Sequence, residues 1–360
     1  MKNATEKLSE MKLREYDNLV VHDMLNIVKD AKSQLSEKEL FRTRGDSDFE
    51  PLARFYHQRF LAIYDVFENR YKRNLVNAFK QFQDYGVLEI ITCGATHGFL
   101  PLLQNIPQTV KAQIEVAANN YKLHLGRQPR GIWLPECGYY PGVDTYLKNA
   151  GISFFFTDTH GILNATPRPR YGAYSPIICP NSGTAVFCRD KESSEQVWSS
   201  VIGYPGHPSY REYYRDVGYD LPFDYIKDYV QPDGTRKNTG IKYYHVTGKT
   251  DKKMPYDLAE ADKIASLNAF DFLVKRQKQI TNLYNIMGRS PVVLSPYDAE
   301  LYGHWWFEGP KWLNYLIRYV AKQDIYKLTT PSEYILNNPV NQLAQPSASS
   351  WGANGYNSFW

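Results

Sequence analysis

The chain has 360 residues, of which 43% are hydrophobic, so it is long enough for one large core, or for one core and a small appendage. Its net charge of +4 is small and evenly spread, which argues against nucleic acid as a partner. The four cysteines form no CxxC pair, which indicates reduced thiols in a cytoplasmic protein rather than a disulfide framework.

The N-terminal stretch and the aromatic content narrow the possibilities further. The first twenty residues are charged and lack the apolar segment of a signal peptide, and no run of 18 apolar residues exists, so no membrane span is expected. Tyr, Phe and Trp make up 15% of the chain, and many of these rings fall in Gly/Pro-rich stretches. Rings with a polar edge suit sugars, which stack on them and hydrogen-bond around them.

In the first half of the chain, helical and strand patterns alternate. Residues 6–38 and 52–84 carry apolar residues at helical spacing. After Gly86, the run VLEIITC predicts a buried strand. The elements expected next are a helix at 109–126 stopped by Gly126, a strand at 131–135, a helix at 142–151 and a strand at 152–158. This alternation with short connections predicts a parallel sheet, either a barrel or an open sheet.

The pattern changes in the second half. Residues 166–255 are dominated by Pro, Gly, Tyr and charged residues, and predict a long irregular insertion of the kind found at binding sites or lids. The helical pattern returns at 258–287. A further strand is expected at 291–298, followed by a helix from about 310 to 322.

Polar side chains stand at the ends of the predicted strands. The first strand brings Cys93 and, four residues on, His97; the second brings Glu136; the last brings Asp298, with Glu300 two residues later. Ligands of parallel α/β proteins bind where the carboxyl ends of the strands converge. Two carboxylates among aromatic rings are the minimal equipment for cleaving a glycosidic bond, because one protonates the leaving oxygen while the other attacks or activates water. Burial against rings would raise the pKa of the acid that must hold its proton.

Plainer interpretations remain open for several of these residues. An acid at a strand end is often a helix N-cap or half of a surface ion pair, and Asp158 fits that reading. His97 taken alone fits a core or loop histidine, and Cys137 fits packing. A metal site could be assembled from Asp298, Glu300 and His304. This spacing, with no second cluster like it, is a weak metal signal, so no metal is expected.

Three long stretches resemble the motifs of glycoside hydrolase family 57, and more narrowly its α-1,4-glucan branching enzymes. LEIITCGATHGFLPLL (88–103) matches the motif with a substrate-site histidine, here His97. The stretch beginning WLPECGYYPG is similar to the nucleophile motif and implies that Glu136 is the nucleophile. SPYDAELYGHWWFEGPKWL (295–313) resembles the acid/base motif and implies that Asp298 is the proton donor.

The resemblance also implies an architecture. The fold expected is α/β, an incomplete (β/α)7 TIM-like barrel with a long aromatic-rich insertion and inserted helices. Residues 1–340 would form the barrel without its first strands, with a helical segment at 1–85 and a lid or insertion at about 166–255. Residues 341–360 would begin a truncated C-terminal helical domain.

The implied activity is a retaining glycosyl transfer. Glu136 would attack the anomeric carbon of an α-1,4-glucan while Asp298 protonates the leaving chain, and Asp298 would then deprotonate the 6-hydroxyl of an acceptor to create an α-1,6 branch. Retention requires the two carboxyls about 5–5.5 Å apart. The substrate would be amylose, glycogen or maltooligosaccharide, with no cofactor. The substrate-binding residues implied are His97, Trp133, Tyr204, Tyr214, His304, Trp305, Trp351 and Trp360.

Two departures from the family accompany this resemblance. No His-x-His motif precedes residue 88, and the sequence ends inside SSWGANGYNSFW (349–360), which resembles the family's last motif. We therefore expect a fragment of a branching enzyme, which can be inactive by itself. The alternatives are an α-amylase or 4-α-glucanotransferase with the same two carboxylates, or a non-catalytic α-glucan-binding protein that keeps the aromatic platform.

Overall fold

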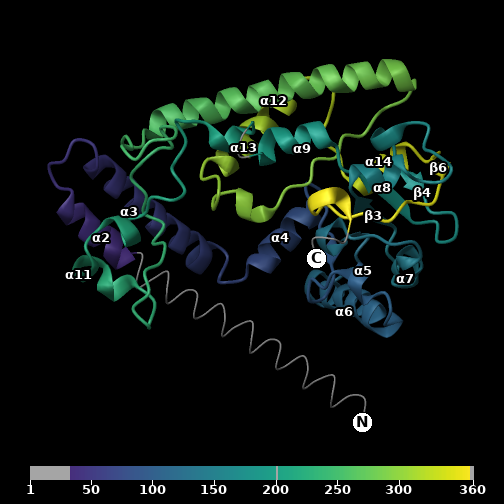
Figure 1. The fold of residues 1–360 in the computed structure, drawn as a ribbon, viewed down its shortest axis with the longest axis horizontal. Coiled ribbons are helices and arrows are strands. Elements are labelled where there is room, and N and C mark those ends of the chain that lie inside the picture. Colours follow the sequence, from purple (N-terminus) through teal and green to yellow (C-terminus); the bar gives the residue numbers. More distant parts are fainter. Residues whose placement is uncertain (1–32, 200–201, 357–360) are drawn as a thin grey trace, which may run out of the picture. The chain divides into compact units, whose positions relative to one another are not determined.

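A computed structural model describes residues 33–199 and 202–356, with many helices and a six-stranded sheet (Figure 1). The chain divides into two compact units, each assembled from separated segments. The first combines the described residues up to Leu75 with His207–Asp262 and Trp305–Glu308. The second contains the other described residues, and the sheet and both predicted catalytic acids belong to it.

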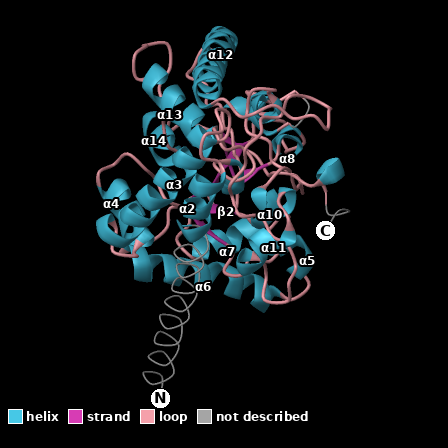
Figure 2. Ribbon diagram, turned by 90° about the vertical axis from the view of Figure 1, so that its left-hand side faces the viewer, coloured by secondary structure: helices cyan, strands magenta, loops and turns pink. Residues whose placement is uncertain are grey.

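The sheet of the second unit is mostly parallel. Its short strands are the magenta segments of Figure 2, among the helices and loops. Its strands are β1 (Thr92–Cys93), β2 (Gly131–Trp133), β3 (Phe154–Thr157), β4 (Ile177–Ile178), β5 (Ala185–Cys188) and β6 (Gln342–Leu343). They lie in the order β1-β2-β3-β5-β4-β6, and every neighbouring pair is parallel except β4 with β5. Within the described chain β1 does not pair with β6, so the sheet is open. The predicted α/β class is confirmed.

The helices are distributed over both units. The first unit contains α2 (Ser33–Arg42), α3 (Glu50–Asp65), a π-helical turn (Val66–Arg70), α10 (Val217–Asp220) and α11 (Phe223–Ile226). The second contains α5 (Leu100–Leu103), α6 (Pro107–Leu125), α7 (Val143–Asn149), α8 (Thr159–Leu163), α9 (Lys191–Trp198), α13 (Gly309–Val320) and α14 (Pro331–Asn337). Two helices begin in the first unit and continue in the second, α4 (Leu75–Asp84) and α12 (Leu258–Met287).

Four predicted helices are confirmed within a few residues. They are 109–126, 142–151, 258–287 and 310–322, which the structure shows as α6, α7, α12 and α13. Gly126 ends α6 with a φ of 74°, the left-handed conformation that makes glycine the common helix terminator. Of the helix predicted at 6–38, residues 6–32 lie outside the described residues.

Three predictions about elements are wrong. The strand expected at 291–298 is reduced to one bridge, between Leu294 and Arg189, because Pro296 has no N–H to donate to a ladder. The stretch 166–255, expected to be irregular, contains β4, β5 and α9, since the buried four-residue run of β5 is too short to stand out among polar neighbours. The helix expected at 52–84 is interrupted between α3 and α4, where Lys72 and Arg73 have φ of 50° and 63°.

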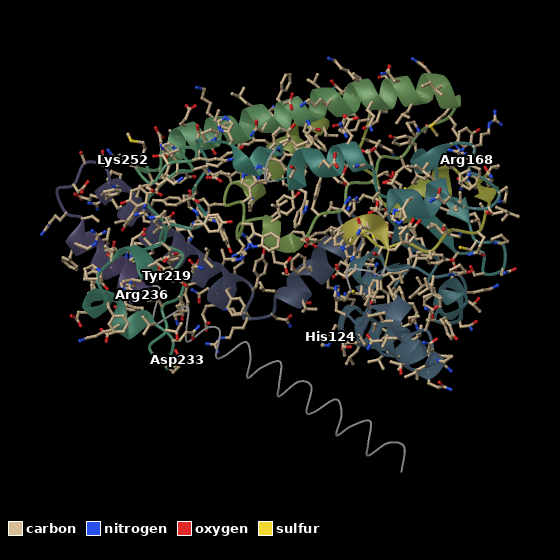
Figure 3. All side chains as sticks on the ribbon, viewed as in Figure 1. His124, Arg168, Tyr219, Asp233, Arg236 and Lys252 are labelled. Carbon is tan, nitrogen blue, oxygen red and sulfur yellow. The ribbon has the colours of Figure 1, made fainter. Side chains whose placement is uncertain are left out.

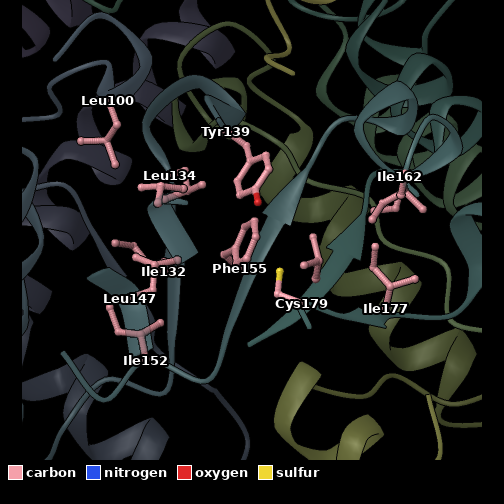
Figure 4. Packing of buried hydrophobic residues seen from close by; sticks show 14 of the residues in the cluster. Leu100, Ile132, Leu134, Tyr139, Leu147, Ile152, Phe155, Ile162, Ile177 and Cys179 are labelled. Atoms are coloured by element: carbon pink, nitrogen blue, oxygen red, sulfur yellow. The ribbon is translucent and has the colours of Figure 1, made fainter. Parts of the chain in front are cut away.

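Packing on the sheet follows the two-residue period of β3. Phe155 points to one face, where its ring stacks on Tyr139 at 5.1 Å between centroids (Figure 4). Phe154 and Phe156 point to the other face, where they pack with Phe187. Alanine cannot replace Gly131 on the neighbouring strand without movement, because a Cβ there would lie 2.1 Å from the ring of Phe154. The central strands are therefore covered on both sides.

The first unit is organised by buried charges. Glu39 of α2 is fully buried and accepts hydrogen bonds from Arg42 and from the hydroxyl of Tyr243. In the same unit the hydroxyl of Tyr219, in α10, donates to the backbone carbonyl of Arg236, and both side chains are labelled in Figure 3. Among the helices that the structure describes, none is both long and apolar enough to cross a lipid bilayer.

Candidate active site

Four neighbouring strands bring polar side chains to one edge of the sheet. β1 ends at Cys93, β2 leads to Glu136, β3 to Asp158 and β5 to Arg189. These strands are parallel to one another, so their carboxyl ends lie at the same edge. That edge is where open α/β sheets bind their ligands. The structure thus brings Cys93 and His97 to the same edge as Glu136, as the strand-end pattern predicted.

Glu136 is held in an unusual backbone conformation. It lies in a short 3₁₀ turn, Pro135–Cys137, and has a φ of 60°, followed by 54° at Cys137. Left-handed conformations of non-glycine residues cost about 1–3 kcal/mol each and cluster at functional sites. The turn is also tightly packed, because a Cβ on Gly138 would lie 2.5 Å from the ring of Phe99. Close packing at Gly138 therefore holds this turn in its left-handed conformation.

Both carboxylate oxygens of Glu136 have partners. Nε2 of His97 lies 3.0 Å from Oε1, and the indole Nε1 of Trp351 donates to Oε2 at 2.6 Å. The backbone N–H of Trp351 also donates to the carbonyl of Glu136 at 3.0 Å. These contacts fix the orientation of the carboxylate and leave its side chain 23% exposed, open to a substrate. His97 and Glu136, which the sequence analysis placed at the ends of two strands, are thus in contact.

His97 is placed by a tight loop after β1. Its φ is 54° and its N–H donates to the carbonyl of Gly94. Its Nδ1 lies 3.2 Å from Sγ of Cys93, so the imidazole joins the thiol to the carboxylate of Glu136. Gln113 of α6 secures the loop, because its side chain accepts from the N–H of Thr96 at 3.0 Å and donates to the Thr96 hydroxyl at 2.7 Å.

Asp298 lies at the end of the segment that bridges to β5, just before a 3₁₀ turn, Ala299–Leu301. Partial burial raises its pKa above the ordinary value for an aspartate, and the negative charges of Glu300 and Glu136 raise it further. His97 opposes these effects. The charge of Glu136 therefore acts on Asp298, and the surroundings of Asp298 favour the protonated form that a general acid needs.

Aromatic side chains flank Glu136. The rings of Trp133 and Trp351 meet edge to face, 4.8 Å between centroids, and Trp133 also contacts Phe156 at 5.9 Å. Trp133 and Trp351 were both predicted as substrate-binding residues. The contact between them and the bond from Trp351 to Glu136 place an aromatic wall beside the carboxylate.

The other predicted substrate-binding residues that the structure describes lie elsewhere in the two units. The hydroxyl of Tyr204 donates to Asp271 of α12 at 2.6 Å and accepts from Gln196 of α9 at 2.7 Å. His304 is exposed in the second unit. Tyr214 and Trp305 are 83% and 42% exposed and belong to the first unit. Trp360 lies outside the described residues.

Residues that sequence reasoning missed hold the site together. Gln113 fixes the loop of His97, yet nothing in its helical pattern marks it. Asp158 caps α8 by accepting from the N–H of Thr159, as its plainer interpretation predicted. Its other oxygen lies 3.7 Å from Nη1 of Arg189, a pairing that only the order of β3 and β5 reveals.

No group of three or more His, Cys, Asp or Glu in the described residues is arranged to hold a metal ion.

Comparison with known proteins finds one matching family and several related enzymes. The model of glycosyl hydrolase family 57 matches residues 2–260. A 1,4-alpha-glucan branching enzyme from Thermococcus kodakarensis is 27% identical over 388 aligned residues, which cover 99% of this chain and 53% of that protein. The chain thus spans about half the length of the curated relatives it matches.

The solved structures that are similar to the chain include two that illustrate the range of activities. The alpha-amylase AmyC from Thermotoga maritima has a TM-score of 0.89 at 46% identity, over 92% of this chain and 64% of that one. A branching enzyme of the same glycosyl hydrolase family, from Pyrococcus horikoshii, has a TM-score of 0.80 at 29% identity, over 94% of this chain and 61% of that one.

Proposed function

The chain belongs to glycosyl hydrolase family 57, whose fold is a (β/α)7 barrel, and from this premise we propose that it acts as a 1,4-alpha-glucan branching enzyme. The proposal rests on relatives named as such enzymes along nearly the whole chain. The single observation that carries it is the arrangement around Glu136, whose two carboxylate oxygens contact His97 and Trp351, together with an Asp298 whose pKa is raised by burial and by the charges of Glu300 and Glu136.

The proposed reaction is a retaining transfer in two steps. In the first, Glu136 attacks the anomeric carbon of an α-1,4-glucan, and the bond to the leaving O4 breaks as Asp298 gives that oxygen its proton. In the second, Asp298 takes the proton of an acceptor 6-hydroxyl, whose oxygen displaces Glu136 from the sugar. The product carries an α-1,6 branch, and both side chains return to their starting protonation states.

The division of roles between the two acids follows from their surroundings. Glu136 contacts His97 and Trp351. These two residues supply hydrogen-bond donors suited to an ionised nucleophile. Asp298 lies where burial and two like charges favour its proton. We propose a carboxyl separation of about 5–5.5 Å, the spacing of retaining enzymes.

We propose that sugars bind along the aromatic wall and the loops near it. His97, Trp133 and Trp351 would contact the sugar at Glu136. Further contacts with the glucan are proposed for Tyr204, Tyr214, His304, Trp305 and Trp360. The hydroxyl of Tyr204 is engaged by Asp271, so this residue would offer its ring rather than its oxygen. Within stretch 166–255, the aromatic segment from Tyr204 to Tyr219 is our candidate for a lid that keeps water from the ester.

A hydrolase is the second candidate, favoured by the 46% identity to the alpha-amylase AmyC. The same two carboxylates would then pass the sugar to water. A glucan-binding protein without turnover is the remaining alternative. We also propose a role in glycogen synthesis and a cytoplasmic location; the location is supported by four free thiols, three of them buried.

The test is incubation of the chain with amylose, with proton NMR of α-1,6 linkages and a parallel assay of reducing ends. Branches from the wild type and none from Glu136→Ala would support the branching enzyme. New reducing ends without branches would favour the amylase. Maltooligosaccharide binding that is equal in both proteins, without any turnover, would favour the binding protein.

A further inference from the structure

The segment that carries Asp298 has little support from the sheet itself. Among the bridges that the described residues form, the one from this segment joins Leu294 to Arg189 at a strand end, and the carbonyl of Leu294 accepts the N–H of Asp190 at 2.8 Å. The four residues between that bridge and the 3₁₀ turn have no ladder partner among the described residues. Something other than strand pairing must therefore fix the position of Asp298.

Two side chains next to Asp298 supply that support by binding the first turn of α9. The hydroxyl of Tyr297 donates to the backbone carbonyl of Ser193 at 3.0 Å. The hydroxyl of Ser295 bonds to the hydroxyl of the same Ser193. Asp298 follows Tyr297 directly, with an extended backbone of φ −66° and ψ 139°. The anchors at 295 and 297 therefore tie the backbone that carries Asp298 to α9.

The anchor point on α9 is itself rigid. Asp190 caps the helix by accepting the N–H of Ser193 at 2.8 Å. Arg276 of α12 lies 3.3 Å from that carboxylate, and both residues are only 2% exposed. Gln279 donates to Asp190 as well. A buried, fully partnered carboxylate of this kind holds the helix end in one place.

We propose that Tyr297 is a positioning residue, whose hydrogen bond to the carbonyl of Ser193 holds Asp298 where it can exchange a proton with the glucan. The proposal rests on the proposed function and deepens it. Burial raises the pKa of Tyr297 above that of an ordinary tyrosine, so its hydroxyl keeps the proton that it donates.

The test removes this one hydroxyl with Tyr297→Phe and compares two substrates. With a maltooligosaccharide, the leaving oxygen needs the proton of Asp298, and misplacement of a catalytic group by about 1 Å can cost about 100-fold. We expect kcat to fall about 10- to 100-fold with KM within about 3-fold. Ser295→Ala should act in the same direction.

The second substrate, α-maltosyl fluoride with azide as acceptor, bypasses proton transfer. The C–F bond breaks as Glu136 bonds to the anomeric carbon, and fluoride leaves without a proton. Azide then displaces Glu136 and forms a glycosyl azide without a general base. We expect the rate of this reaction in Tyr297→Phe to stay within about 3-fold of wild type, which a general structural defect would not allow.

The matched control is Tyr121→Phe. Tyr121 of α6 is also buried, and its hydroxyl donates to the backbone carbonyl of Ile90 at 2.8 Å. Both reactions should be close to wild type in this variant. Equal loss on both substrates in Tyr297→Phe, or no loss on either, would overturn the positioning role alone. A wild type that matches Glu136→Ala on both substrates would overturn the proposed function, and the positioning role with it.

Discussion

Trp351 and Glu136, which are 215 residues apart in the chain, are joined by two hydrogen bonds. The indole N–H donates to Oε2 of the carboxylate at 2.6 Å, and the backbone N–H donates to the backbone carbonyl at 3.0 Å. One bond fixes the strained turn that carries Glu136, and the other fixes its side chain. Trp351 therefore combines a ring proposed to bind sugar with control of the proposed nucleophile.

Replacing Trp351 with phenylalanine separates these two roles. Trp351→Phe keeps a ring beside Trp133 and the backbone bond, but removes the indole N–H. A hydrogen bond to a charged group contributes about 1.5–3 kcal/mol, so we expect kcat/KM for maltooligosaccharide to fall about 10- to 100-fold. The thermal midpoint should change little. Wild-type kcat/KM in Trp351→Phe, with a large loss only in Trp351→Ala, would show that the ring alone matters.

The contact between Cys93 and His97 predicts one tautomer of the imidazole. Burial raises the pKa of the Cys93 thiol, so the thiol keeps its proton and can donate it to Nδ1 of neutral His97. Nε2 then carries the hydrogen that faces Glu136. Nitrogen-15 NMR, with His97→Gln for assignment, should report the Nε2–H form in wild type. Cys93→Ser should retain it, and Cys93→Ala should show a mixture; a pure Nε2–H signal in Cys93→Ala would contradict this role.

Much of the site could be predicted because it follows strand ends. Glu136 follows an apolar run after a clear helix, and the parallel order of β1 and β2 then brings it to His97. The alternation of helices and strands also indicated the parallel sheet correctly. These features depend on local periodicity, which a single sequence displays.

Other features depend on contacts that spacing does not encode. The bonds from Trp351 to Glu136 close a loop of 215 residues, and only motif resemblance had indicated Trp351. The segment of Asp298 has the apolar composition of a strand, but its proline and its attachment to α9 leave it outside the ladder. The hydrogen bond from the Tyr204 hydroxyl to Asp271 could not be predicted either, because nothing in the sequence of α12 distinguishes Asp271 from its other polar residues.

Removing the charge of Glu300 should move the alkaline limb of the pH profile. Glu300 raises the pKa of Asp298, so Glu300→Gln should lower that pKa. A general acid works while it is protonated, and activity is lost as the pH rises through its pKa. The alkaline limb of log kcat/KM for maltooligosaccharide should therefore shift to lower pH in the variant, while the acid limb stays in place. A shift to higher pH, or none, would contradict the interaction.

The two carboxylates around Arg276 should differ sharply in their contribution to stability. Asp190 is buried, accepts from Arg276, and caps α9, whereas the side chain of Glu192 is 64% exposed although it lies 2.5 Å from the same guanidinium. Breaking a buried pair leaves an uncompensated charge and costs about 3–5 kcal/mol. An exposed ion pair contributes about 0–1 kcal/mol.

We therefore expect Asp190→Asn to lower the free energy of unfolding in urea by about 3 kcal/mol, and Glu192→Gln by less than about 1 kcal/mol. Unfolding is followed by circular dichroism, which reports the helices, and by tryptophan fluorescence, which reports the packing around α12 and α13. Equal losses in the two variants would mean that Arg276 is satisfied by either partner, so that the anchor of α9 is not the buried pair. Unequal losses in the reverse order would assign the anchor to Glu192.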